Sequence, residues 1–263
     1  MFFNYINLIK LSILFNIKRT QYFKLDALFS FITGTIYIAT GILFWYILLD
    51  LGITLKGWNF SDVMVFIAFS ELFYGIETSI FGVMSRFWRV IHIGQLDMLL
   101  IRPLDPRLRF FILNIKLTGL LTAIIKFIII IIISGKQLNI LFVICGILIV
   151  LLANTILALI RLFLTYLAFW CGNMDALSEL TDSLTQFNKY PLVIFPAVIK
   201  FFCMFGFPFY FFSTYPAELV LNKLNTHTLL WGSFCLCFNI CFWIILNRLL
   251  WKKGRNKYES ING

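Results

Sequence analysis

The sequence predicts an all-α polytopic membrane protein with six transmembrane helices, an N-terminal interfacial helix and short re-entrant helices before the last span. Hydrophobic residues make up 61% of the chain and charged residues only 13%, whereas soluble domains contain about 25% charged residues. With a mean hydropathy of +0.92, a fold of this size would leave more apolar surface than water tolerates. Six apolar stretches also reach the length of about 20 residues that a helix needs to cross a bilayer.

Residues 1–24 precede the first apolar stretch and predict a helix that lies flat in the membrane interface. Four isoleucines recur there at helical spacing: Ile6, Ile9, Ile13 and Ile17. Lys18 and Arg19 fall off that face, and basic side chains at the interface attract anionic lipid headgroups. The alternative is a partial seventh span.

The transmembrane domain is predicted to cover residues 25–250, and residues 251–263 to form a basic cytoplasmic tail. The six predicted spans are residues 25–49, 63–84, 110–134, 138–170, 192–213 and 229–249. The fourth stretch is about 33 residues long, or roughly 50 Å as a helix, whereas the hydrocarbon layer is about 30 Å thick. It must therefore tilt or project beyond the membrane.

Four prolines interrupt the chain before the last span: Pro191, Pro196, Pro208 and Pro216. Proline breaks the hydrogen-bond ladder of a helix. We therefore expect the fifth span to bend or end early. Residues 209–228 are then expected to re-enter the outer leaflet as short helical pieces.

Basic residues are distributed very unevenly between the two sides of this topology. If the N-terminus is cytoplasmic, the inner segments 1–24, 85–109, 171–191 and the C-terminal tail hold 15 of the 22 lysines and arginines. The outer segments hold only Lys56, Lys136 and Lys223. Because cytoplasmic loops are enriched in basic residues, both termini are predicted to face the cytoplasm. This membrane topology accounts for the net charge of +10, and no nucleic-acid partner is expected.

The loop between the second and third spans, residues 85–109, has the pattern of a compact rigid helix. Gly94 favours a left-handed end of the preceding helix. Leu96, Leu99 and Leu100 then share one side of a short helix, and Asp97 lies on another. Pro103 disfavours helical backbone at the residue before it and ends the element. Such a helix suits docking into a groove on a partner.

The residues of this loop, Gly-x-Leu-Asp-x-Leu-Leu-x-Arg-Pro-Leu-x-Pro from Gly94 to Pro106, resemble the cytoplasmic motif of ABC-2 type transporter permeases. A second stretch also resembles that family: Tyr190-Pro-Leu-x-Ile-Phe-Pro196, followed by Pro208 and Tyr215-Pro-Ala217. The order and spacing of both motifs cover nearly the whole chain. The resemblance implies the transmembrane fold of a type-2 ABC exporter in the bacterial plasma membrane.

The resemblance also implies partners and a division of labour between subunits. Two permease chains pair, as a homodimer or a heterodimer, and two copies of a separate ATPase bind beneath them. ATP and Mg²⁺ would bind to that ATPase, and no cofactor to this chain. The coupling helix of the family would correspond here to Gly94, Leu96, Asp97, Leu99, Leu100, Arg102 and Pro103. The interfacial helix would correspond to residues 4–22 and the re-entrant helices to residues 209–228.

Motifs of other function classes are not found in the sequence. It has no Gly-x-x-x-x-Gly-Lys-Ser/Thr loop for ATP phosphates. Its six cysteines form no Cys-x-x-Cys pair, and only two histidines occur, which argues against a metal site. A membrane-embedded enzyme is therefore the weakest alternative. An ATP-independent channel or secondary carrier predicts internal repeats, and no convincing repeat is present.

Ionisable residues at membrane depth are costly and are candidates for function. Five were identified: Glu71, Glu77, Lys126, Arg161 and Lys200. By depth, Glu71 would pair with Lys126 and Glu77 with Arg161. Lys200 would either face a wet cavity or pair with a carboxylate. The pairs either fix the packing of the helices or line a translocation path, and the sequence leaves both open.

Gly34 and Gly41 lie two turns apart on the first span. Small residues let helices approach closely in lipid. The pair is a candidate for the interface between two permease chains, and packing within one chain is an equal alternative.

Overall fold

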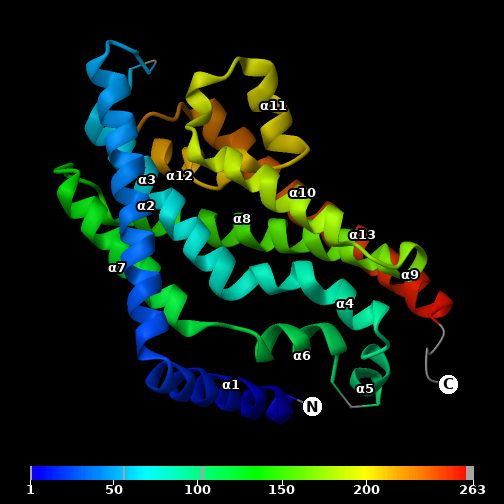
Figure 1. Ribbon diagram of the computed structural model, residues 1–263. Coiled ribbons are helices and arrows are strands. Elements are labelled where there is room, and N and C mark those ends of the chain that lie inside the picture. The colour runs from blue at the N-terminus through cyan, green and yellow to red at the C-terminus, as the bar shows by residue number, and fades with distance from the viewer. Residues whose placement is uncertain (1, 56, 102–103, 259–263) are drawn as a thin grey trace.

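The computed structural model of the chain describes residues 2–55, 57–101 and 104–258, and these form helices joined by short loops (Figure 1). No β-strand occurs within those ranges. α1 (Phe2–Tyr22) lies crosswise at the foot of α2 (Lys24–Asp50) and contacts α2, α6 and α7. The N-terminal segment is therefore a helix separate from α2, and its place in the membrane interface stays a prediction.

Within the described residues, four helices are long and apolar enough to cross a membrane. They are Lys24–Asp50, Phe60–His92, Ile140–Cys171 and Thr226–Lys257. A fifth span results if the bent pair formed by α6 (Pro106–Leu113) and α7 (Leu117–Ile133) is counted as one. The architecture is that of a polytopic membrane protein, but the structure does not confirm six spans.

The second apolar helix extends beyond the predicted end at residue 84 and changes its winding on the way. It comprises α3 (Phe60–Ile76), a π-helical turn η1 (Glu77–Phe81), a 3-10 turn η2 (Gly82–Arg86) and α4 (Phe87–His92). Gly82 faces the carboxylate of Glu77, and a Cβ added there would lie 2.6 Å from its Oε1. The helix therefore changes its winding at the buried Glu77, whose carboxylate occupies the space beside Gly82.

The third predicted span is not one straight helix. Its two parts, α6 and α7, meet at an angle of 64°. At the break, the backbone amide of Lys116 donates to the carbonyl of Ser79, a residue of the π-helical turn, at 2.7 Å. Because the Lys116 amide bonds to Ser79 and not to a carbonyl of α6, α6 does not continue and α7 begins as a new helix at Leu117.

The fifth predicted span, residues 192–213, is not one helix, and the expectation that it bends or ends early fits the structure. The region contains only short pieces: η4 (Leu192–Ile194), α11 (Ala197–Phe205), η5 (Phe209–Phe211) and then α12 (Thr214–Val220). α11 has nine residues, about 14 Å of helix, which is too short to cross. Pro196 lies at its N-terminal cap and Pro208 three residues past its end, so the prolines set both limits.

Two long helices complete the bundle. α8 (Ile140–Tyr166) and the short α9 (Ala168–Cys171) form the long fourth span that was predicted. α13 (Thr226–Lys257) packs along α8 and stays helical through residue 257. The tail predicted to begin at residue 251 is therefore helical over most of its length.

The core lies between α3, α7, α8, α12 and α13. Phe73 of α3 stacks on Phe212 with ring centroids 4.0 Å apart, and both side chains are fully buried. α2 packs less closely, contacting α3, α7 and α1 along one side.

At the end of the bundle that holds α12, one buried carboxylate connects α3 to two loops. Asp62 of α3 makes ion pairs with Lys136 at 2.7 Å and Lys223 at 2.6 Å. These lysines lie in the loops before α8 and before α13. Two of the three basic residues predicted on the outer side therefore converge on one carboxylate, and the third, Lys56, lies outside the described residues.

Candidate functional site

A polar segment runs along α3 through the depth of the bundle. This segment, α10 (Asp175–Thr185) with the 3-10 turn η3 (Gln186–Lys189), runs antiparallel to the helix Phe60–His92 and also contacts α8. Three hydrogen bonds mark the contact: Ser178 Oγ to Ser85 O at 3.0 Å, Tyr74 OH to Thr185 O at 2.7 Å, and Ser70 Oγ to Asn188 O at 3.4 Å. We call this contact the α3–α10 seam.

The seam shows that residues 171–191, predicted as an inner segment between two spans, contain a helix that packs against the rest of the bundle. Between Ser85 and Ser70 the seam follows 15 residues of the helix Phe60–His92, which begins as α3 and continues through η1 and η2, over roughly 20 Å. The segment therefore packs along this helix, and its place relative to the membrane stays a prediction. Its polar sequence was interpreted as a loop because hydropathy identifies only apolar helices and does not predict a polar helix that packs against protein.

The Arg161 cavity opens on the half of the seam that is nearer α4, with a volume of about 570 Å³. Arg161 of α8 is 4% exposed and forms an ion pair with Glu77 of the π-helical turn. Its other nitrogen, Nη2, contacts Asp182 Oδ1 of α10 at 2.7 Å, and Asp182 is 61% exposed. The structure thus brings Glu77 and Arg161 together, and adds a carboxylate from α10 that depth along the spans could not reveal.

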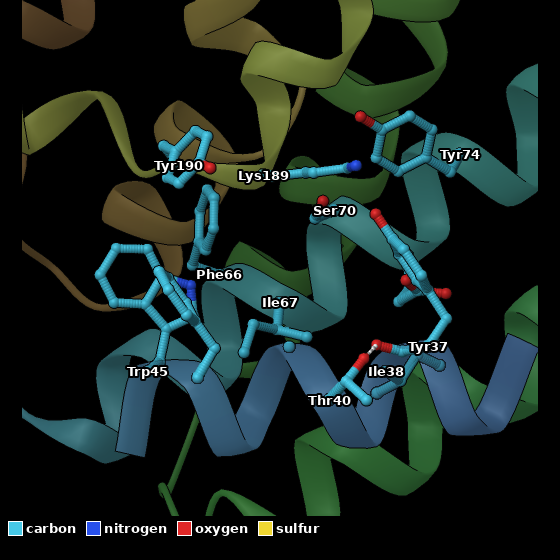
Figure 2. A pocket seen from close by; sticks show the side chains of 13 residues that line it. Tyr37, Ile38, Thr40, Trp45, Phe66, Ile67, Ser70, Tyr74, Lys189 and Tyr190 are labelled. Atoms are coloured by element: carbon cyan, nitrogen blue, oxygen red, sulfur yellow. Dashed lines mark hydrogen bonds between the residues drawn. The ribbon is translucent and has the colours of Figure 1, made fainter. Parts of the chain in front are cut away.

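The Glu71 pocket lies between α2, α3 and η3 and has a volume of about 270 Å³. Figure 2 shows Tyr37 and Trp45 of α2 facing Phe66 and Tyr74 of α3, with the Lys189 side chain extending toward Tyr74. Glu71 is part of the lining and makes no ion pair within the described part of the chain. The pocket combines aromatic walls with a single carboxylate.

The predicted pair of Glu71 with Lys126 is present only as a longer-range interaction. The charge of Lys126 reaches Glu71, but its Nζ lies against Gly34 of α2 and 5.6 Å from the ring centroid of Phe31. Gly34 leaves room for that ammonium and has an intrachain packing role. At Gly41 an added Cβ would meet nothing within 4 Å, and this glycine lines the Glu71 pocket.

Lys200 has a carboxylate partner, which was one of the two predicted outcomes. Its Nζ lies 3.9 Å from Glu218 Oε1 of α12 and 5.6 Å from the ring centroid of Tyr210. Tyr210 also donates a hydrogen bond to Glu218. This cluster fastens α11 to α12 and lies apart from the residues that line the two seam cavities.

Tyr74 lines both the Arg161 cavity and the Glu71 pocket. Its hydroxyl is held by the bond to the Thr185 carbonyl, so the ring stands between the two spaces. Sequence analysis missed Tyr74 because a tyrosine in an apolar helix reads as core. Asp182 and Lys189 were missed because α10 was assigned to a loop.

The predicted docking helix is present as α5 (Leu96–Leu100). Gly94 has a φ of +74° and turns the chain after α4. Leu96 is fully buried against an aromatic cluster that includes Phe87, Tyr166 and Trp251. Two of the three leucines predicted to share a face, Leu96 and Leu99, lie on the inner face of α5, and the third, Leu100, is exposed.

The outer face of α5 and the residue after it carry exposed apolar side chains. Met98 is 74% exposed and Ile101 is 84% exposed, and Leu100 is also exposed. Asp97 points to the end of α13: burial raises the pKa of Tyr258 to about 12, and the charge of Asp97 adds to that rise. Arg102 and Pro103 lie outside the described residues.

The exit from the α5 loop is fixed to α13. Asp105 caps α6 by accepting from the backbone amide of Arg107 at 2.9 Å, and it accepts from the Arg107 guanidinium at 2.5 Å. That guanidinium also lies 4.8 Å from the ring centroid of Trp251. Burial opposes ionisation of Asp105, but the bonds from Arg107 outweigh it and hold its pKa below the usual value.

No group of three or more potential ligand side chains that could hold a metal ion is present among the described residues. A family model described as ABC-2 family transporter protein matches residues 35–262. No curated protein and no solved structure gives a significant match. The match includes both cavities of the seam and the α5 loop, and begins after α1.

Proposed function

Because the chain belongs to the ABC-2 family of transporter proteins, we propose that it is the membrane-spanning permease subunit of an ATP-driven exporter in the bacterial plasma membrane. It pairs with a second permease, identical or different, and with two copies of a separate ATPase that bind ATP and Mg²⁺. The α5 end of the bundle faces the cytoplasm, with both termini on that side. Five basic residues in 85–109 and the basic C-terminal end support this orientation.

The single observation that carries this proposal beyond the family is the exposed apolar tip of α5. Met98 and Ile101 project outward, while Leu96 anchors the same short helix in the aromatic cluster. Large exposed apolar side chains on a rigid support are suited to insertion into a groove of a partner. In this arrangement movement of the bound ATPase is passed to α4 and α13.

The α3–α10 seam is the proposed path. A polar helix such as α10 is not stable against lipid, so its exposed polar side faces water or the second permease. The Arg161 cavity opens on the cytoplasmic side, and the Glu71 pocket lies farther along the same seam. α1 lies in the inner interface, with its basic residues toward lipid headgroups.

Co-purification with an ABC ATPase tests the assignment. We expect an ATPase encoded beside this chain to bind it, and binding to be lost when residues 94–101 are scrambled. Transport that continues without any ATPase would contradict the proposal and favour a channel or secondary carrier. Reconstitution with and without the ATPase decides between them.

A further inference from the structure

We propose that the Glu71 pocket binds a ligand that carries a positively charged nitrogen and a compact aromatic or branched apolar body. The inference rests on the proposed function in that the bound molecule would be the one transported. It names the chemical class of that molecule, which neither the family nor the exporter assignment provides.

The first argument comes from the other acidic groups of the bundle. The described residues contain three buried carboxylates, and each forms an ion pair: Asp62 with Lys136 and Lys223, Glu77 with Arg161, and Glu218 with Lys200. Glu71 is half-buried. Glu71 forms none, although Lys126 acts on it from a distance. An ionised carboxylate at this depth is costly without a partner. A cationic ligand would supply the partner that the fold leaves out.

The second argument comes from the walls of the pocket. Tyr37, Trp45, Tyr74 and Tyr190 contribute aromatic rings to the lining. The faces of such rings attract ammonium groups, most strongly where water is excluded. Aromatic walls around one acid are a combination that selects for a cation with an apolar body, because the rings also bury that body.

The third argument is that the pocket already holds an ammonium of the chain itself. Lys189 Nζ lies 5.4 Å from the ring centroid of Tyr37. Lys189 Nζ donates a hydrogen bond to Gln186 Oε1 at 3.3 Å, and the side chain is otherwise exposed. The Lys189 ammonium thus lies near the face of the Tyr37 ring and is held there by only a long hydrogen bond. A ligand cation would displace it, so Lys189 competes with the ligand.

The size of the pocket limits the ligand. Its volume of about 270 Å³ lies just below the range of roughly 300–1,000 Å³ of most small-molecule sites. The open space beside Gly41 allows the apolar body to continue toward α2. The pocket therefore fits a small organic cation, or the charged end of a longer amphiphile.

Binding of benzyltrimethylammonium to the full-length chain in uncharged maltoside micelles tests the proposal. Neopentylbenzene has the same shape without the charge and serves as the matched ligand. We expect saturable binding of radiolabelled benzyltrimethylammonium in equilibrium dialysis, with weak competition by neopentylbenzene. Glu71→Gln is expected to weaken binding at least about tenfold, which corresponds to ~1.4 kcal/mol.

Two further variants and a control distinguish the effect of charge on binding from an effect on folding. Lys189→Gln is expected to tighten binding severalfold, because the competing ammonium is gone. Tyr37→Leu keeps every charge and is expected to weaken binding of the cation severalfold. Asp50→Asn changes an exposed carboxylate at the far end of α2 and is expected to have no effect.

The proposal is overturned if the wild-type chain shows no saturable binding, or if neopentylbenzene competes as well as the cation does. It is also overturned if Glu71→Gln and Tyr37→Leu bind normally. Weaker binding of the cation in Lys189→Gln would show that Lys189 supports the pocket instead of competing with the ligand, and would overturn the proposed competition. These outcomes are independent of the exporter assignment, because co-purification of the ATPase depends on α5 and is measured in the same Glu71→Gln preparation.

Discussion

The hydroxyl of Tyr74 donates a hydrogen bond of 2.7 Å to the carbonyl of Thr185, and this contact stands between the two cavities of the α3–α10 seam. On the proposed path along the seam, a substrate moving from the Arg161 cavity to the Glu71 pocket passes Tyr74, which lines both cavities. Such a bond contributes about 1 kcal/mol, so it is weak enough to be broken once in each transport cycle.

Truncating Tyr74 should connect the two cavities. In a chain whose six free cysteines are replaced by alanine, Thr40→Cys places a thiol in the Glu71 pocket. We expect a membrane-impermeant maleimide added from the α5 side to label it about ten times faster when Tyr74→Ala is also present. Tyr74→Phe keeps the ring and should give a much smaller increase. Equal labelling rates in all three chains would show that Tyr74 does not separate the cavities.

Removing one partner of the buried Arg161–Glu77 pair should destabilise the protein strongly. Glu77→Gln leaves the Arg161 charge with only the exposed Asp182, and we expect a loss of about 3 kcal/mol in unfolding free energy. Asp182→Asn is the matched control on the same arginine, and it should cost less than about 1 kcal/mol. Denaturant titration in mixed micelles measures both. Equal costs would mean that burial of Glu77 is not the deciding factor.

Charging the tip of α5 should abolish ATPase binding without unfolding the chain. Met98→Glu and Ile101→Glu alter side chains that are mostly exposed, so the helix stays anchored by Leu96. Ile53→Glu makes the same change at an exposed position in the α2–α3 loop and should retain the ATPase. Pull-down of the ATPase with each variant is the measurement. Normal binding to both α5 variants would exclude this tip as the docking surface.

Acid should weaken the attachment of the α5 loop through Asp105. Its folded pKa is depressed, so its contribution to stability is fully present above the unfolded pKa of about 4. The contribution is lost as the pH falls through the lower folded value. Asp105→Asn should therefore be less stable than the wild type at pH 6, and the difference should shrink below about pH 4. Thermal unfolding followed from pH 6 to pH 3 tests this, with Asp50→Asn as the control. A pH-independent difference would contradict the assignment.

Composition and local pattern alone determined the membrane class, the positions of most apolar helices and the turn at Gly94. They could do so because bilayer thickness fixes the length of an apolar helix, and a left-handed backbone favours glycine. The pairing of Glu77 with Arg161 could also be anticipated, since depth along two spans follows from counting residues.

Only the tertiary structure decided where the polar segment 175–189 lies, and with it the site. Hydropathy measures the cost of exposure to lipid, but the side of α10 that faces α3 is exposed to protein. The same reason hides Tyr74 among core aromatics and places the unpaired Glu71 beside a cavity. Whether an intramembrane charge is paired depends on which helices pack together. That is set by contacts between residues far apart in the chain, such as Ser70 with Asn188.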